Sequence, residues 1–503
     1  MCERVRASDL VGCHYRLVQR RRFPEVGPTE ASISRAERTV AARAAAWGNL
    51  PVKGDSKRFP FRRFDLGPLP AADPWLRSLE TLEALAAGAT HITGALLCTD
   101  EWEVAVDVLV RDRDSGLYTP VIVSNHRVAR RHESRRIPGV PTHRLGLSDA
   151  LPLPFKPRHH AVDGYQLGLA ARALAELGLD SGQGGVIGQD RETVFFFSTD
   201  NYQPALDTAL QAVAPENLPC APRRVRECAS CRFWEKCEPQ LRAVDEISLF
   251  LPGDRARAYR EMGIDSIGKL IDANLGLSSH LARAWRDGQV LLRTGSKPLV
   301  VPRADVEIDI DMEAYLDLGA YLWGTFTATS YRPFVTWEPL GGRQEAANFA
   351  AFWQWLMARR ASAHAEGKSF AAYCYSAHGE NHWMRMSAKR FQGFPGIPTP
   401  EDVEAFISSD EWVDLFALVK ANFVGPFGLG LKTVAPQAGF TWQDGEFAGE
   451  ESVAARRIAL ADDDTGRAMR AKLLSYNSDD VQATACIRTW MSAGAPGIPV
   501  IGQ

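Results

Sequence analysis

The sequence predicts an α/β fold class distributed over several domains. A chain of 503 residues is too long for a single hydrophobic core. Its 45% hydrophobic and 24% charged residues are ordinary for a globular protein. Segments rich in β-branched and aromatic residues alternate with segments whose apolar residues recur at helical spacing, and this alternation is typical of layered α/β folds.

Residues 1–240 are expected to form the first domain. The runs HITGALLCTD, EWEVAVDVLVRD, LYTPVIVSN and TVFFFST are rich in β-branched and aromatic residues and are bounded by Gly, Asp or Pro. These features predict strands of one sheet. The later segment DGYQLGLAARALAELGL has the apolar spacing of a helix, and we expect it to pack on that sheet.

Residues 241–300 are expected to be a helical connector. The stretch MGIDSIGKL within it has the glycine and apolar pattern of a helix–hairpin–helix turn, whose backbone amides can hold a phosphate. A plain helical linker fits the same pattern, so the stretch does not by itself assign a DNA contact.

Residues 301–503 are expected to form the last domain. The segment ADVEIDIDMEAYLDLGAYLWGTF predicts two strands separated by a turn, and FAAYCYSAHGE predicts a further strand followed by a turn. Helices are expected at NFAAFWQWLMARRASAH, EWVDLFALVKANF and AKLLSYNSDDVQATACIRTWM. Strands and helices in this order favour a layered α/β or α+β domain.

Charge and hydropathy limit the cellular setting but do not assign a partner. Residues 1–240 carry 32 Lys and Arg against 29 Asp and Glu, whereas residues 241–503 carry 26 against 32. The basic runs RLVQRRRF, RVARRHESRR, FKPRHH and APRRVREC suit phosphate binding and solvated faces equally well. No run of 18 apolar residues occurs, and MCERVRASDL has no apolar stretch typical of a secretory signal, so we expect a cytoplasmic protein without membrane spans.

Three cysteines lie within ten residues, in the segment CASCRFWEKC. Cys228, Cys231 and Cys237 are spaced C-x2-C-x5-C. Structural zinc and iron–sulfur sites usually take four protein ligands, so these three thiols imply a fourth. Cys13 is the best candidate, and the alternatives are Cys220 and Cys2.

This cysteine arrangement resembles the iron–sulfur members of the RecB family of nucleases, which include AddB-type and CRISPR-associated enzymes. The resemblance implies a restriction-endonuclease-like PD-(D/E)xK domain over residues 1–240. It also implies a 4Fe–4S cluster held by Cys13, Cys228, Cys231 and Cys237. Such a cluster would close a loop of more than two hundred residues, so its loss should loosen the whole domain. The alternatives are a zinc site and a cluster of buried cysteines without metal.

The nuclease motif implied by this resemblance is incomplete. Asp107 falls where the family has a metal-binding Asp, which would be a ligand of Mg²⁺. The expected E-x-K is missing, because positions 121–124 read VIVS; His126 and Arg127, further along, are possible substitutes. We therefore expect a degenerate site that retains nucleic-acid binding, with Asp107 either a metal ligand or a turn or surface carboxylate.

A second group of acidic residues lies in the last third of the chain. Asp311 and Glu313 share one face of a predicted strand, and Asp309 lies on the same face. The other three candidates are Glu380 after the next predicted strand and the Y-x3-D pair Tyr476 and Asp480 on the last helix, with Asp479 as a neighbouring alternative to Asp480.

These motifs resemble the DnaQ-like exonucleases of ribonuclease H fold, close to the YprB group. The resemblance implies a DEDD site in which Asp311, Glu313, Glu380 and Asp480 bind Mg²⁺ or Mn²⁺ while Tyr476 positions water. It implies a metal-dependent nuclease that acts on DNA, trimming single strands or ends from 3′ to 5′ in repair or recombination, with a helicase as a possible partner. The alternative is a non-catalytic nucleic-acid-binding scaffold that works beside a helicase or nuclease.

Overall fold

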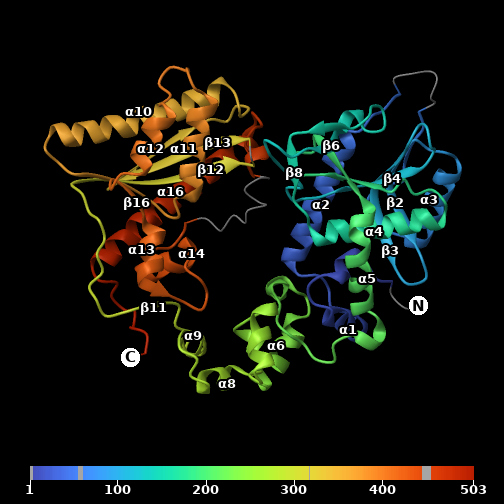
Figure 1. Cartoon of the computed structure of the whole chain (residues 1–503), viewed down its shortest axis with the longest axis horizontal. Coiled ribbons are helices and arrows are strands. Elements are labelled where there is room, and N and C mark those ends of the chain that lie inside the picture. Colours follow the sequence, from blue (N-terminus) through green and yellow to red (C-terminus); the bar gives the residue numbers. More distant parts are fainter. Residues whose placement is uncertain (1–3, 55–60, 317, 444–454, 503) are drawn as a thin grey trace. The chain divides into compact units, whose positions relative to one another are not determined.

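The computed structural model describes residues 4–54, 61–316, 318–443 and 455–502. It divides into two compact units, Met1–Ile267 and Gly268–Gln503 (Figure 1). The expected connector 241–300 is shared between the two units and forms the short helices α7 (Arg257–Glu261), α8 (Ile267–Asp272) and α9 (Leu277–Arg286). None of the helices in the described ranges combines the length and hydropathy that crossing a membrane requires.

The first unit is built on an eight-stranded mixed sheet. The runs predicted as strands form β2, β3, β4 and β10. In spatial order the strands are β1 (Arg63–Asp65), β2 (His91–Cys98), β3 (Glu103–Arg111), β4 (Tyr118–Val123), β9 (Gln183–Ile187), β10 (Thr193–Ser198), β6 (Ile137–Pro141) and β7 (Leu151–Leu153). A separate antiparallel ribbon pairs β5 (Ala129–Arg131) with β8 (Phe155–Pro157).

Helices cover both faces of this sheet. The predicted helix is α4, and its Leu169 and Leu174 share a hydrophobic core with Val104 and Leu109 of β3. The opposite core contains Ala46 of α2. The helices of the unit before the connector are α1 (Tyr15–Arg22), α2 (Glu30–Gly48), α3 (Pro74–Ala86), α4 (Ala161–Glu176), α5 (Gln203–Ala212) and α6 (Trp234–Ala243).

The second unit contains a five-stranded sheet. Counted along the chain from β12, its strands lie in the spatial order 3-2-1-4-5. The central strand pairs antiparallel with the second strand and parallel with the fourth. In spatial order the strands are β14 (Ser330–Val335), β13 (Gly319–Thr327), β12 (Val306–Tyr315), β15 (Phe370–Cys374) and β16 (Trp412–Asp414). A two-residue pair, β11 (Leu292–Arg293) and β17 (Phe423–Val424), lies outside this sheet.

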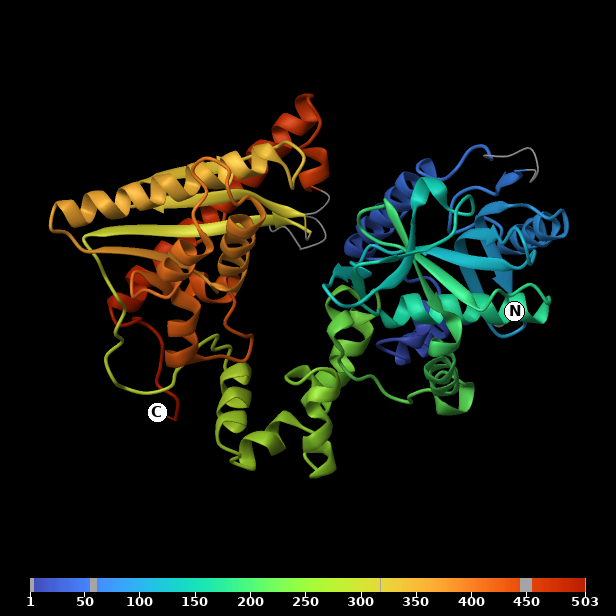
Figure 2. The ribbon, with the colours of Figure 1, turned by 45° about the horizontal axis from the view of Figure 1, so that its top comes forward.

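The central strand β12 separates an apolar face from an acidic one. Ile308 and Ile310 are buried in a core with the helices α10 (Arg343–Ala365), α11 (His378–Arg390) and α12 (Pro400–Ile407), and Figure 2 shows α10 running along the sheet. Because side chains alternate along a strand, Asp309, Asp311 and Glu313 point the other way, toward α16 (Asp464–Ser492). Helices α13 (Leu415–Asn422) and α14 (Leu431–Val434) pack with α16.

Two local expectations for this unit differ from the structure. Residues 412–414 form β16 instead of the start of a helix, because the Asp414 carboxylate accepts the backbone N–H groups of Phe416 and Ala417 and caps α13 at Leu415. The predicted turn after β15 is short, so Glu380 lies in the first turn of α11.

Candidate active site

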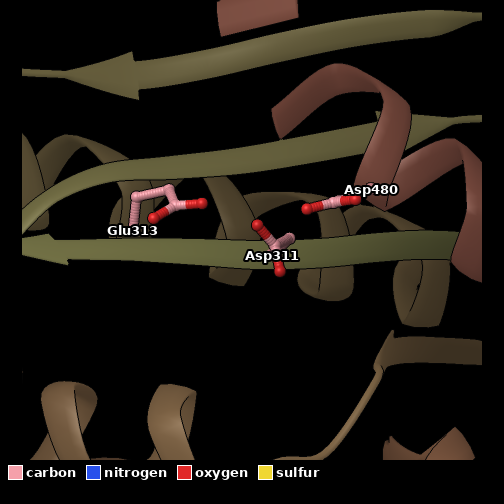
Figure 3. Close-up of side chains that lie close together, drawn as sticks. All are labelled: Asp311, Glu313 and Asp480. Atoms are coloured by element: carbon pink, nitrogen blue, oxygen red, sulfur yellow. The ribbon is translucent and has the colours of Figure 1, made fainter. Parts of the chain in front are cut away.

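Three carboxylates from two elements meet on the acidic face of β12. Asp311 and Glu313 extend from the strand toward Asp480 on α16 (Figure 3). One oxygen from each side chain lies within 4.8 Å of an oxygen of the other two. The sequence predicted all three residues as metal ligands, and the fold brings together side chains that are about 170 positions apart.

An ion pair fixes the helix that carries Asp480 against the strand. Arg488 of α16 donates from Nη2 to Asp309 Oδ2 at 2.7 Å and from Nε to Asp309 Oδ1 at 3.3 Å. The same guanidinium contacts Glu307 and lies over the ring of Tyr373. Asp309, the alternative to Asp311, is therefore committed to a buried structural pair and does not join the three carboxylates.

Asp479 and Asp480 also have different roles: the first has a structural contact and the second belongs to the carboxylate group. Asp479 Oδ2 accepts the backbone N–H of Gln443 at 2.8 Å, and Asp480 Oδ1 accepts the indole N–H of Trp442 at 2.8 Å. Asp479 thus holds the chain segment before residue 444, while Asp480 is oriented by Trp442 and faces the strand.

A positioning residue that the sequence reading missed holds Asp311 in place. Asn477 donates from Nδ2 to Asp311 Oδ2 at 2.6 Å, and its Oδ1 accepts the hydroxyl of Tyr331 at 2.8 Å. Gly324, the residue paired with Asp311 across β12 and β13, leaves the space that the Asn477 amide occupies. The available signal was the position of Asn477, three residues before Asp480 and so on the same helical face.

Glu380 lies beside this group without joining the three oxygens within 4.8 Å. It is 5% exposed at the start of α11. Burial, and then the charges of Asp414 and Glu313, raise its pKa to about 8. The Glu380 charge in turn raises the pKa of Asp311, so the fourth predicted carboxylate belongs to the same electrostatic site.

The four carboxylates carry more negative charge than their surroundings neutralise. Burial, and then the charges of Asp480, Glu313 and Glu380, raise the pKa of Asp311 well above its ordinary value. Burial and Asp480 raise the pKa of Glu313 to about 7, and burial raises that of Asp480 to about 6. Carboxylates that raise one another's pKa bind protons or cations, and their oxygens are the ligands that Mg²⁺ and Mn²⁺ prefer.

Tyr476 and Lys432 complete the rim of the site. Tyr476 lies one turn before Asp480, and its hydrogen bond lowers the pKa of that carboxyl. Lys432, at the start of α14, places Nζ 4.9 Å from the centre of the Tyr476 ring and lowers the pKa of both Glu313 and Asp480. Val434 of the same short helix packs in a core with Ile487 of α16, which fixes the lysine relative to the carboxylates.

The four predicted cysteine ligands lie near one another in the first unit, but among the described residues no three of their sulfur atoms lie within 4.8 Å of one another. Cys13 and Cys231 pack with the buried Cys237 around Phe233, and Gln19 of α1 donates to the Cys237 thiol at 3.2 Å. Burial raises the pKa of Cys228 to about 11, and the charges of Cys13, Cys231 and Cys237 contribute. Of the alternative fourth ligands, Cys220 is exposed and Cys2 lies outside the described residues.

Asp107 has a different environment from the carboxylates of the second unit. Its Oδ1 accepts Arg43 Nε of α2 at 2.5 Å, and its Oδ2 accepts the backbone N–H of Val123 at 2.6 Å. Among the residues the structure describes, no group of three metal-ligating side chains forms around it. Arg43 was not recognised from the sequence. Asp107 is buried within β3 and joins α2 to β4, so the expectation of a turn or surface carboxylate is wrong, and its role as a metal ligand stays a prediction.

Comparison with known proteins supports the assignment of the second unit. Searches of curated proteins and of solved structures give no match. Residues 310–492 match the family model of the RNase_H superfamily, a range that contains Asp311, Glu313, Glu380, Tyr476 and Asp480. The C-terminal part of the chain is therefore a ribonuclease H-like domain, as the sequence predicted.

Proposed function

We propose that the protein is a metal-dependent nuclease that hydrolyses phosphodiester bonds at the carboxylate site of its C-terminal domain. The observation that carries the proposal is the convergence of Asp311, Glu313 and Asp480 within 4.8 Å, with Glu380 beside them. The ribonuclease H-like domain is compatible with this activity.

The carboxylate oxygens of this site suit the binding of one or two divalent cations. Asp311, Glu313 and Asp480 would hold Mg²⁺ or Mn²⁺, and Glu380 would complete a two-ion site. Metal bound there supplies activation of water and neutralisation of charge on the phosphate. The raised pKa values of these carboxyls fit this role. They reflect repulsion between ionised carboxylates, and a bound cation would relieve that repulsion and stabilise the site.

The protein's own side chains orient the reacting groups. Asn477 fixes the Asp311 carboxylate through Oδ2 and leaves Oδ1 for a ligand. Tyr476, whose hydroxyl bonds to Asp480, is placed to hold the attacking water at the carboxylate. The Lys432 ammonium, close to Glu313 and Asp480, is placed to stabilise negative charge that develops on the phosphate.

We further infer, from family resemblance, that the substrate is DNA trimmed as single strands from the 3′ end in repair or recombination. In this proposal the first unit is RecB-like, holds nucleic acid and carries a 4Fe–4S cluster on Cys13, Cys228, Cys231 and Cys237. The gathering of these thiols supports the cluster. The occupation of both Asp107 oxygens by Arg43 and Val123 supports a non-cleaving role for this half.

The decisive experiment is digestion of end-labelled single-stranded DNA with Mn²⁺. Asp311→Asn should lower cleavage by at least about 100-fold, because it removes one ligand and one negative charge from the site. Asp107→Asn should leave cleavage at the wild-type level. Asp464→Asn, which alters a fully exposed carboxylate at the start of α16, is the matched control.

The outcomes separate the two candidate functions. Loss confined to Asp311→Asn supports the proposal. Equal loss in Asp107→Asn would show that the first unit also cuts. Binding without cleavage by the wild-type protein would leave the nucleic-acid-binding scaffold as the function.

The cluster has an independent test. Protein purified without oxygen should be brown, with an absorbance band near ~400 nm that Cys231→Ser abolishes, because iron–thiolate ligation produces this band. Colourless protein with one equivalent of zinc would contradict the iron–sulfur assignment and support the zinc alternative.

A further inference from the structure

The segment 126–160 of the first unit concentrates basic residues to an unusual degree. It contains eight lysines and arginines against two acidic residues, and five of the chain's eleven histidines. Its central part forms the β5–β8 ribbon, which lies outside the eight-stranded sheet (Figure 1). The proposed chemistry at the C-terminal carboxylates uses none of these residues.

The ribbon holds two like charges directly opposite each other. Arg130 of β5 pairs with Lys156 of β8 in the antiparallel register, so their side chains emerge on the same face. Like charges in this arrangement destabilise a sheet. Arg158 follows two residues later, and its backbone N–H is bonded to Val128 O at 2.8 Å. Within the described part of the chain, none of these three side chains has a carboxylate partner.

The opposite face of the ribbon anchors it to the domain. Phe155 packs against Phe195 of the main sheet with ring centres 5.1 Å apart, and Ala129 is buried in the same core. Arg131 lies over the Phe155 ring at 5.7 Å. The ribbon is therefore held firmly on its apolar side, and Arg130 is exposed on the other.

Two histidines stand at the base of the ribbon. The rings of His126 and His160 stack with centres 4.2 Å apart and an angle of 14°. His160 is bonded to the backbone of Arg127, while its Nε2 is buried without a hydrogen-bond partner. Asp163, in the first turn of α4, interacts electrostatically with both rings, and its Oδ2 is also buried without a hydrogen-bond partner. His126 precedes β5 and His160 follows β8, so the stacked rings bring the two ends of the ribbon together.

We propose that the β5–β8 ribbon is a docking surface for the phosphate backbone of a single strand of nucleic acid. The proposal rests on the proposed nuclease function and assigns its substrate a second contact, in the first unit. Uncompensated basic side chains on a rigid element supply the sequence-independent part of nucleic-acid binding. A membrane surface is disfavoured as the occupant, because the paired positions that face away from the core carry charged side chains and no apolar ones.

The test measures binding of a labelled single-stranded oligonucleotide of about 20 nucleotides, longer than one typical site. Fluorescence anisotropy is recorded in EDTA over a range of salt concentrations, with the full-length protein. The ribbon variant combines Arg130→Gln, Lys156→Gln and Arg158→Gln. The control combines Arg172→Gln, Arg242→Gln and Arg257→Gln, which remove three charges that are ion-paired in the same unit.

The ribbon variant should bind about 100-fold more weakly near 0.1 M salt, and the slope of log K against log salt should fall by about 2, because three phosphate contacts are lost. The control should keep the wild-type slope. An unchanged slope in the ribbon variant, or an equal change in the control, would overturn the proposal. Wild-type protein that binds vesicles containing phosphatidylserine and not DNA would also overturn it.

A second readout does not depend on variants. Acylation of Lys156 in the wild-type protein, followed by mass spectrometry, should be slowed at least about tenfold by saturating oligonucleotide, because a phosphate-bound amine is shielded. Unprotected Lys156 would contradict the proposal. Cleavage assays on the same samples distinguish the two claims: a ribbon variant that binds and cuts like wild type refutes only the ribbon, whereas wild-type protein that binds through the ribbon without cutting refutes only the nuclease.

Discussion

At the scale of single residues, the site is defined by carboxyls whose pKa values are raised together. Burial and mutual repulsion place the pKa of Asp480 at about 6, of Glu313 at about 7 and of Glu380 at about 8. The same side chains titrate near 4 in an unfolded chain. The folded protein therefore holds protons that the unfolded protein releases between these values.

This difference predicts the pH dependence of stability without metal. A group whose pKa is higher in the folded state favours folding when protonated, so the free energy of unfolding in EDTA should fall as pH rises from about 5 to about 8, by on the order of 2–4 kcal/mol. Denaturant titration at several pH values measures it. Mn²⁺ should restore the loss at pH 8, and Asp311→Asn should flatten the dependence. A metal-free stability that rises over this range would contradict the electrostatic description.

Lys432 gives a second prediction at this scale. Its ammonium lowers the pKa of Glu313 and Asp480. Lys432→Met should therefore shift the acidic limb of the pH–rate profile to higher pH, by about one pH unit. Lys432→Arg keeps the charge and should keep the limb in place. A slower Lys432→Met enzyme with an unshifted limb would mean that the lysine acts on the substrate alone.

The sequence predicted the acidic residues of the candidate site but not the residues that hold them in position. Asp311, Glu313 and Asp480 were predicted because motif spacing on a strand and a helix fixes which side chains share a face, and Glu380 was predicted from the family resemblance. Asn477 could not be assigned, because its role depends on the space above Gly324 on a neighbouring strand. That space is a property of the packed structure.

At the scale of elements, the pairing of β12, β13 and α16 sets the geometry. A Cβ at Gly324 would collide with Oδ1 of Asn477 and displace the amide that holds Asp311. Gly324→Ala should therefore lower cleavage at least about tenfold and cost about 1–3 kcal/mol of stability. Gly342→Ala is the control, since a Cβ there meets no atom within 4 Å. Wild-type cleavage by Gly324→Ala would show that Asn477 is dispensable.

The ion pair between α16 and β12 makes a matching prediction. Arg488→Met leaves Asp309 buried and uncompensated, so unfolding should become easier by about 3–5 kcal/mol. Adding Asp309→Asn removes the unpaired buried charge and should recover part of the lost stability. Thermal and denaturant unfolding of the three proteins measure these effects. If Arg488→Met alone is as stable as the wild-type protein, the ion pair does not hold the helix in place.

The long elements of this domain were predictable and the shortest were not. Strands β12 and β13 and helix α16 follow from strong residue patterns over nine or more residues. The three-residue strand β16 was read as the start of a helix, because its apolar residues also suit the helix that follows. Its pairing with β15 and the Asp414 cap of the following helix together select the extended form.

At the scale of the whole molecule, the chain combines two units of different character. The first carries the cysteines and the basic ribbon, and the second carries the carboxylates and the match to the RNase_H superfamily. The sequence predicted an acidic catalytic part and a basic part that holds nucleic acid. The division at residue 267 falls within the predicted connector 241–300, whose composition does not mark the exact position of the boundary.

Anomalous scattering from crystals grown with Mn²⁺ would show whether the C-terminal carboxylates share divalent metal. A manganese peak is expected in contact with Asp311, Glu313 and Asp480, and no such peak is expected in Asp311→Asn. Manganese found elsewhere in the protein, or no manganese at these side chains at saturating concentration, would contradict the proposed metal site.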